Sequence, residues 1–111
     1  MKEKIEFSEF LEIEKKLEIK YGTIKEVQRI NKKMLKLSVD FGEEELRTVV
    51  TNIGKKASED MLISGQFPFI TNLKPAIISG YESTAMIMLA EDENKNIQWP
   101  TDGFKEGSIM L

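Results

Sequence analysis

Three polar side chains of different chemistry lie along one segment of this chain. Residues 72–86 contain the amide of Asn72, the ammonium of Lys74 and the hydroxyl of Ser83. Such groups can pair with a phosphate and hydrogen-bond to a sugar or an unpaired base. Pro75 cannot donate to a β-ladder, so the segment should leave a strand and form a loop before the next one. Such a loop could border a ligand site, and an ordinary polar turn is the alternative.

Basic residues concentrate between residues 15 and 36. This segment holds eight basic and two acidic residues, a balance of +6, whereas the whole chain carries −3. A local positive region can bind phosphates on an acidic protein, because local potential and counterion release govern binding. The alternative is a set of lysines that only keeps a strand pair solvated. The basic residues that we expect to approach phosphates are Lys32, Lys33, Lys36 and Arg47.

Two residue types that support most catalysis do not occur in the chain. Without cysteine or histidine there are no disulfides, thiolate nucleophiles, imidazole bases or common transition-metal ligands. We therefore expect a non-enzymatic protein with no cofactor and no metal. No apolar run approaches the roughly 20 residues that span a bilayer, and the start of the chain is too polar for a signal peptide. We expect a cytoplasmic protein with no membrane partner.

The clearest structural signal is an alternation from Leu35 to Phe41. Leu35, Leu37, Val39 and Phe41 are apolar and the residues between them are polar, so a strand with Lys36 on its solvent face is predicted. Ser8 should cap a short helix over 9–14, Ser58 should cap another after it, and Gly22 should mark a bulge or a bend. The other predicted strands are 17–21, 46–53, 66–71, 86–90 and, as the last barrel strand, 97–99.

This element order favours one domain over residues 1–111, all-β with short helices. Short antiparallel strands with a helix between the third and fourth are typical of a five-stranded OB-fold barrel. Such barrels bind ligands on the second and third strands and the flanking loops. Here that face would carry Lys36, Ser38, Arg47 and Thr51, with the 72–86 loop alongside.

The polar segment also resembles a known family signature. Asn72-Leu73-Lys74-Pro75 with Gly80, Glu82-Ser83 and Met86 is similar to the signature of the tRNA-binding domain found at the C-terminus of many bacterial methionyl-tRNA synthetases. Stand-alone dimeric tRNA-binding proteins and CsaA-type export chaperones contain the same domain. Segments 7–11, 21–24 and 35–42 follow the family's order too. The resemblance implies an OB-fold, tRNA as partner, and a tRNA-contacting side that includes Asn72, Lys74, Ser83 and Met86.

The chain departs from the family pattern at several places. Asn31-Lys32-Lys33-Met34-Leu35 stands where many relatives have Asn-Ala-Asp-Lys-Leu, and Thr51-Asn52 stands where Ser-Gly is common. Ala85 replaces a glycine, and Gly65-Gln66-Phe67 replaces Gly-Lys-Lys. Two basic contacts of the relatives are therefore missing.

These observations predict a non-catalytic tRNA-binding protein that recognises shape and backbone with little sequence specificity. It would be an accessory or C-terminal domain of methionyl-tRNA synthetase. The alternatives are a chaperone that binds unfolded polypeptide in an apolar groove, or a pure dimerisation module. We expect Asn72 and Ser83 to face ligand or solvent, and Met86 to serve either recognition or packing. The candidate tRNA-binding residues are Lys32, Lys33, Lys36, Arg47, Thr51, Asn52, Asn72, Lys74, Ser83 and Met86.

Both chain ends are apolar. Ile5, Phe7, Phe10 and Leu11 stand near the start, and the chain stops on residues 109–111, Ile-Met-Leu. Pairing about a two-fold axis would bury both sets, so we predict a homodimer joined through the chain ends. The alternative is a monomer in which these residues plug the two ends of the barrel.

Overall fold

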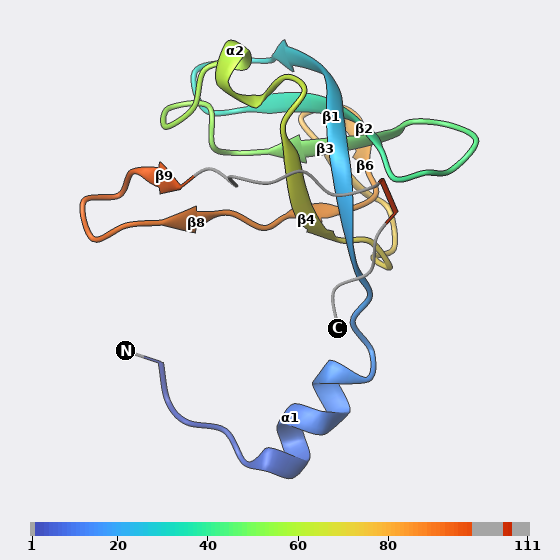
Figure 1. Cartoon of the computed structure of the whole chain (residues 1–111), viewed down its shortest axis with the longest axis vertical. Helices are drawn as coiled ribbons and strands as arrows, with labels where there is room; N and C mark the ends of the chain where they lie inside the picture. Colours follow the sequence, from blue (N-terminus) through green and yellow to red (C-terminus); the bar gives the residue numbers. More distant parts are fainter. Residues whose placement is uncertain (1, 99–105, 108–111) are drawn as a thin grey trace.

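A five-stranded antiparallel sheet curls into a nearly closed barrel in this computed structural model, which describes residues 2–98, 106 and 107 (Figure 1). The strand order is β3 (Arg47–Thr51), β2 (Leu35–Asp40), β1 (Ile19–Arg29), β4 (Gln66–Ile70) and β7 (Met86–Ile87). β1 pairs with β4 through its first half and with β2 through its second. The two outer strands, β3 and β7, pack against each other. The predicted all-β barrel with short helices is confirmed.

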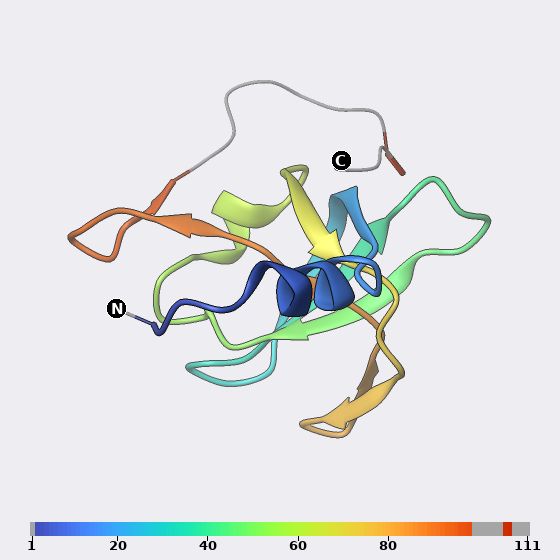
Figure 2. The same cartoon turned by 90° about the horizontal axis from the view of Figure 1, so that it is seen from below.

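Two small hairpins project from different sides of the barrel (Figure 2). The first joins β5 (Ala76–Ile78) to β6 (Tyr81–Ser83), so the 72–86 segment contains paired strands where the sequence predicted a loop. Ser79 and Gly80 have φ angles of 52° and 85°, the pattern of a tight hairpin turn. The chain therefore reverses at Ser79 and Gly80.

The second hairpin corrects one strand prediction. β8 (Ala90–Glu91) pairs with β9 (Ile97–Gln98) in a separate two-stranded sheet, so 97–98 is not a barrel strand, and residue 99 lies outside the described residues. The physical reason is the turn between them. The Asp92 carboxylate accepts hydrogen bonds from the backbone N–H groups of Asn94 and Asn96, which directs the chain back along β8.

The barrel interior follows the predicted alternation on β2. Leu35, Leu37 and Val39 are fully buried. A side chain on Gly22 would collide with this core, because a Cβ there would lie 2.5 Å from Val39 Cγ1 and 2.6 Å from Phe41 Cε1. Gly22 therefore permits close packing and is not a bulge. The register shift of β1 lies between residues 24 and 26 instead.

The two helices are placed very differently. α2 (Glu59–Leu62) lies between β3 and β4 and buries Leu62 in the core. α1 (Phe7–Glu14) lies apart from the barrel and has no buried residue (Figure 1). It begins after Glu6, so Ser8 is not its cap, and the Ser58 side chain makes no capping hydrogen bond to α2. Among the described residues, no helix is long and apolar enough to cross a membrane.

Candidate nucleic-acid interface

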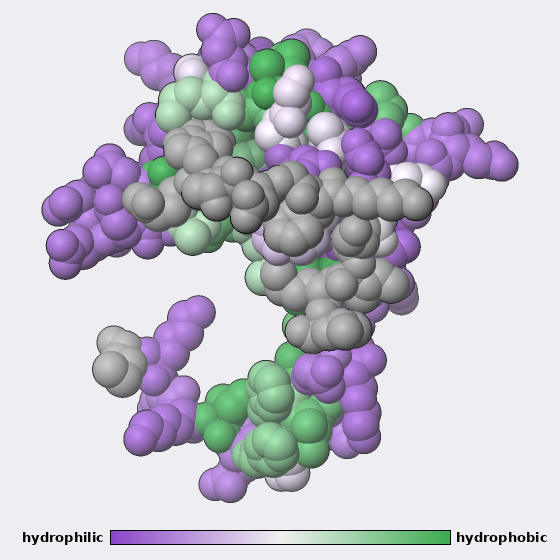
Figure 3. Space-filling view, viewed as in Figure 1, coloured by the Kyte–Doolittle hydropathy of each residue, from purple (hydrophilic) through white to green (hydrophobic). Residues whose placement is uncertain are grey.

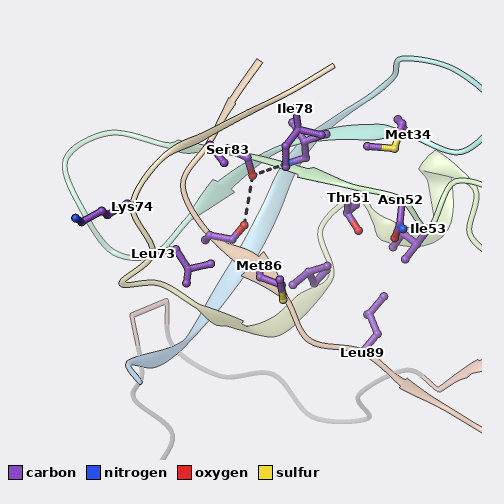
Figure 4. A pocket seen from close by; sticks show the side chains of 14 residues that line it. Met34, Thr51, Asn52, Ile53, Leu73, Lys74, Ile78, Ser83, Met86 and Leu89 are labelled. Atoms are coloured by element: carbon purple, nitrogen blue, oxygen red, sulfur yellow. Dashed lines mark hydrogen bonds between the residues drawn. The ribbon is translucent and has the colours of Figure 1, made fainter. Parts of the chain in front are cut away.

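A largely apolar pocket of about 600 Å³ opens on the outer side of β3 (Figure 4). Its walls come from three places in the sequence: the β1–β2 loop, β3 with the residues after it, and the 73–89 segment. Of its fourteen lining residues ten are apolar and none is acidic. The polar members are Thr51, Asn52, Lys74 and Ser83. This is the surface on which barrels of this type bind their ligands.

The pocket gathers half of the ten candidate residues. Thr51, Asn52, Lys74, Ser83 and Met86 line it. Met86 is 56% exposed, which excludes the core-packing role considered for it. Lys32 and Lys33 lie beside it in the β1–β2 loop, next to the lining residue Met34. Lys36, Arg47 and Asn72 are outside the lining.

Ser83 serves the barrel as well as the pocket. It is only 6% exposed, and its hydroxyl accepts a hydrogen bond of 3.0 Å from the Val50 N–H. The next residue, Thr84, donates its N–H to the Thr48 carbonyl at 3.2 Å. β3 is an edge strand, and these bonds satisfy backbone groups that would otherwise be unpaired. Ser83 lines the pocket, but the expectation that it faces only ligand or solvent is wrong, because it is buried and bonded to β3.

Asn72 fastens the chain that leads from α1 to β1. Its side-chain oxygen accepts a hydrogen bond from the Glu18 N–H at 2.9 Å, and its amide nitrogen donates to the Lys16 carbonyl. The neighbouring Thr71 N–H donates to the Glu18 carbonyl at 2.9 Å. Although Asn72 is exposed, both ends of its amide are occupied within the chain. The expected exposure of Asn72 is confirmed, and its amide in addition makes hydrogen bonds within the chain.

Arg47 is also committed to the fold. It makes two hydrogen bonds to the Glu43 carboxylate, at 2.7 and 2.8 Å, and donates to the Thr71 carbonyl at 2.7 Å. The Arg47 hydrogen bond lowers the pKa of Glu43 below its ordinary value, and the same bond raises the pKa of Arg47. The guanidinium thus joins the β2–β3 loop to the end of β4.

The positive segment 15–36 divides into bound and free cations. Arg29 pairs with Glu59 at 2.7 Å and donates to several carbonyls, and Lys20 lies 3.6 Å from Glu18. The Lys36 ammonium lies 4.6 Å from the centre of the Tyr81 ring, a cation–π contact that links β2 to the β5–β6 hairpin.

The cations nearest the pocket remain available. Lys32, Lys33 and Lys74 are exposed, and none of them forms an ion pair with a described residue. These three are the lysines best placed for a phosphate backbone.

Comparison with known proteins identifies the family. The family model described as "Putative tRNA binding domain" matches residues 19–108. The chain belongs to this family. Methionine–tRNA ligases of Helicobacter pylori and Methanococcoides burtonii match this tRNA-binding domain at 39% identity over 99 residues and 40% over 97. Each alignment covers 86% of the domain, which spans only 15% and 14% of the two ligases.

Solved structures of similar shape span nearly the whole tRNA-binding domain. A MetRS-related protein from Pyrococcus horikoshii has a TM-score of 0.79 at 33% identity, with 99% of this chain and 100% of that chain covered. The chaperone CsaA of Bacillus anthracis has a TM-score of 0.76 at 21% identity, with 98% and 100% covered. The second likeness shows the shared fold alone.

Sequence reasoning missed the apolar side of this pocket. Met34, Ile53, Leu73, Ile78 and Leu89 line it, and none was a candidate. Three of them stand next to candidates in the sequence: Met34 follows Lys33, Ile53 follows Asn52, and Leu73 precedes Lys74. The apolar residues next to the polar candidates at strand ends were therefore the sequence feature that could have indicated the pocket.

Proposed function

We propose that this tRNA-binding domain binds tRNA without catalysing a reaction of its own, reading shape and backbone with little sequence preference. The observation that carries the proposal is the pocket on β3, because it lies between the two connections that OB-fold barrels use for oligonucleotides. Lys74 lines it, Lys32 and Lys33 belong to the β1–β2 loop that contributes Met34, and none of the three forms an ion pair with a described residue. Neither short helix of the described chain resembles a recognition helix that would read a groove, which favours backbone contacts.

Salt-dependent binding of bulk tRNA tests this proposal. The double variant Lys32→Glu with Lys33→Glu should weaken binding to all tRNAs alike, because phosphate contacts carry no sequence information. Loss of two such contacts should also reduce the slope of log affinity against log salt by about 1.4–1.8. Lys2→Glu with Lys4→Glu is the matched control, since it changes the charge equally outside the family match. A loss confined to one tRNA species would contradict the proposal.

The partners of the domain follow from its size and its ends. Because it is similar to a part of methionine–tRNA ligases, we propose that it acts with such a synthetase in the cytoplasm, as an accessory or as its C-terminal domain. We also propose a homodimer. Phe7, Phe10 and Leu11 of α1 are 68%, 46% and 37% exposed, so the N-terminal residues do not plug the barrel as the alternative required. Residues 109–111, the other half of the proposed interface, lie outside the described residues.

A second candidate function has one observation in its favour. The apolar walls of the pocket, together with the exposed side chains of Ile77 and Met86 nearby, also suit apolar segments of an unfolded polypeptide. Competition between bulk tRNA and a reduced, carboxymethylated protein for the domain distinguishes the two functions. If tRNA is the main ligand, the polypeptide should displace tRNA only at concentrations far above those at which tRNA displaces the polypeptide.

A further inference from the structure

We propose that the pocket on β3 takes one unstacked base of the bound RNA, with the base edge at Thr51 and Asn52 and a phosphate at Lys74. This inference rests on the proposed function and adds to it. Recognition by backbone alone requires only cations on a surface. The pocket is a concave site between two connections, and its size is within the 300–1,000 Å³ of small-molecule sites.

The polar groups of the pocket are separated into two regions. Thr51 and Asn52 lie side by side at one end, and Lys74 lies at the other (Figure 4). Among the described residues, no hydrogen bond is formed by the Thr51 hydroxyl or the Asn52 amide, and no buried polar side-chain atom lacks a partner, so both groups are open to the pocket. A hydroxyl and a carboxamide together offer donors and acceptors, as the edge of an unpaired base requires.

The apolar walls between these regions fit a flat aromatic ring. Met34 and Met86 come from different sides of the pocket, and Leu73 and Ile78 form parts of its wall (Figure 4). Thioether sulfur makes favourable contacts with aromatic rings, and the flexible methionine side chain adapts to rings of different size. The walls would therefore accept purines and pyrimidines alike, in agreement with little sequence preference.

The charge around the pocket favours a nucleotide over an apolar peptide. Among the residues that the structure describes, no acidic side chain lines the pocket, Lys74 lies at one end, and Lys32 and Lys33 precede the lining residue Met34. A peptide side chain would leave the Thr51 and Asn52 groups without partners, which costs free energy when they are covered. A nucleotide supplies a polar edge, an apolar ring and an anion in one ligand.

Two single-stranded RNA probes of about twelve nucleotides, one with bases and one abasic, separate base contacts from phosphate contacts. The wild-type domain should bind the base-bearing probe about tenfold more tightly. Asn52→Ala should weaken only the base-bearing probe, by about fivefold. Lys74→Gln should weaken both probes equally, because it removes a phosphate contact. Asn52 is exposed and its side chain makes no bond to a described residue, so the variant should fold; Asn94→Ala, at another exposed amide, is the control.

Several results would overturn the inference. Equal affinity of the wild type for the two probes would show that no base binds in the pocket. An Asn52→Ala variant that binds like the wild type, or loses both probes equally, would do the same. Binding of tRNA without base dependence would defeat this inference alone, whereas failure to bind any tRNA would defeat the proposed function. Displacement of the base-bearing probe by a carboxymethylated polypeptide, with Asn52→Ala unchanged, would assign the pocket to peptides.

Discussion

Asn72, a residue of the family signature, holds a neighbouring segment of the chain in place. Both ends of its amide are bonded to the chain between α1 and β1, through Lys16 and Glu18. In Asn72→Ala, hydrogen exchange at the Glu18 amide should accelerate about fivefold, the equivalent of roughly 1 kcal/mol for one lost hydrogen bond. Asn72→Asp keeps the acceptor for the Glu18 N–H and should have a smaller effect.

Asn52→Ala provides the matched control for this prediction, because the Asn52 side chain has no partner among the described residues. Exchange at Glu18 should be unchanged in that variant. If Asn72→Ala left the Glu18 exchange unaltered and yet weakened tRNA binding, Asn72 would be a ligand contact after all.

The sequence did not reveal these residue roles because they depend on distant partners. The partner of Ser83 is the Val50 N–H, 33 residues earlier in the chain. Val50 lies on the edge strand β3, so its N–H needs an acceptor from outside the sheet. Lys36 was predicted correctly on the solvent face from local alternation, but its contact with Tyr81 depends on the hairpin folding back. The grouping of Thr51, Asn52 and Lys74 needed no such detail, because the barrel topology alone brings these segments together.

At the scale of elements, the apolar–polar periodicity predicted single strands correctly, but it did not predict how a turn pairs one strand with another. The alternation of Leu35, Leu37 and Val39 sufficed for β2, since inward and outward positions are set residue by residue. Residues 97–98 were predicted in the wrong sheet. The Asp92 turn determines that they pair with β8, and the apolar or polar character of two residues does not reveal this pairing.

The ion pair between Glu43 and Arg47 should make the junction of β2, β3 and β4 sensitive to acid. The Arg47 hydrogen bond holds the pKa of Glu43 below its ordinary 4.5. A lowered folded-state pKa gives stability that is present above pH 4.5 and is lost as the pH falls through the folded-state value. Glu43→Gln should therefore be less stable at pH 7 by about 0.5 kcal/mol, since the pair is partly exposed, and should lose less stability in acid.

Urea unfolding at pH 7 and at pH values below 4.5 measures this difference. Glu44→Gln is the control, because Glu44 is exposed and has no ion pair with a described residue. An acid-induced loss of stability as large in Glu43→Gln as in the wild type would show that other carboxylates, such as Glu18 beside Thr71, dominate.

At the scale of the whole molecule, the position of α1 is the feature that contacts within one chain do not explain. It has eight residues, none buried, and its apolar side chains gather on one surface (Figure 3). Phe7 and Phe10 stack with ring centres 6.2 Å apart, and both remain about half exposed or more. An isolated helix of this length is marginal in water, so its stability requires a partner surface. The bonds of Asn72 to residues 16 and 18 hold the start of β1 where such a surface would be presented.

We therefore expect light scattering at micromolar concentration to give twice the mass of the 12.7 kDa chain. Phe7→Glu with Phe10→Glu should give a monomer, because a paired apolar surface cannot accommodate four buried carboxylates across a two-fold axis. Met61→Glu, at a residue of α2 that is 48% exposed, should leave the dimer intact. A monomeric mass for the intact chain would exclude the dimer. A dimer that survives both the α1 variant and deletion of residues 109–111 would place the interface elsewhere on the barrel.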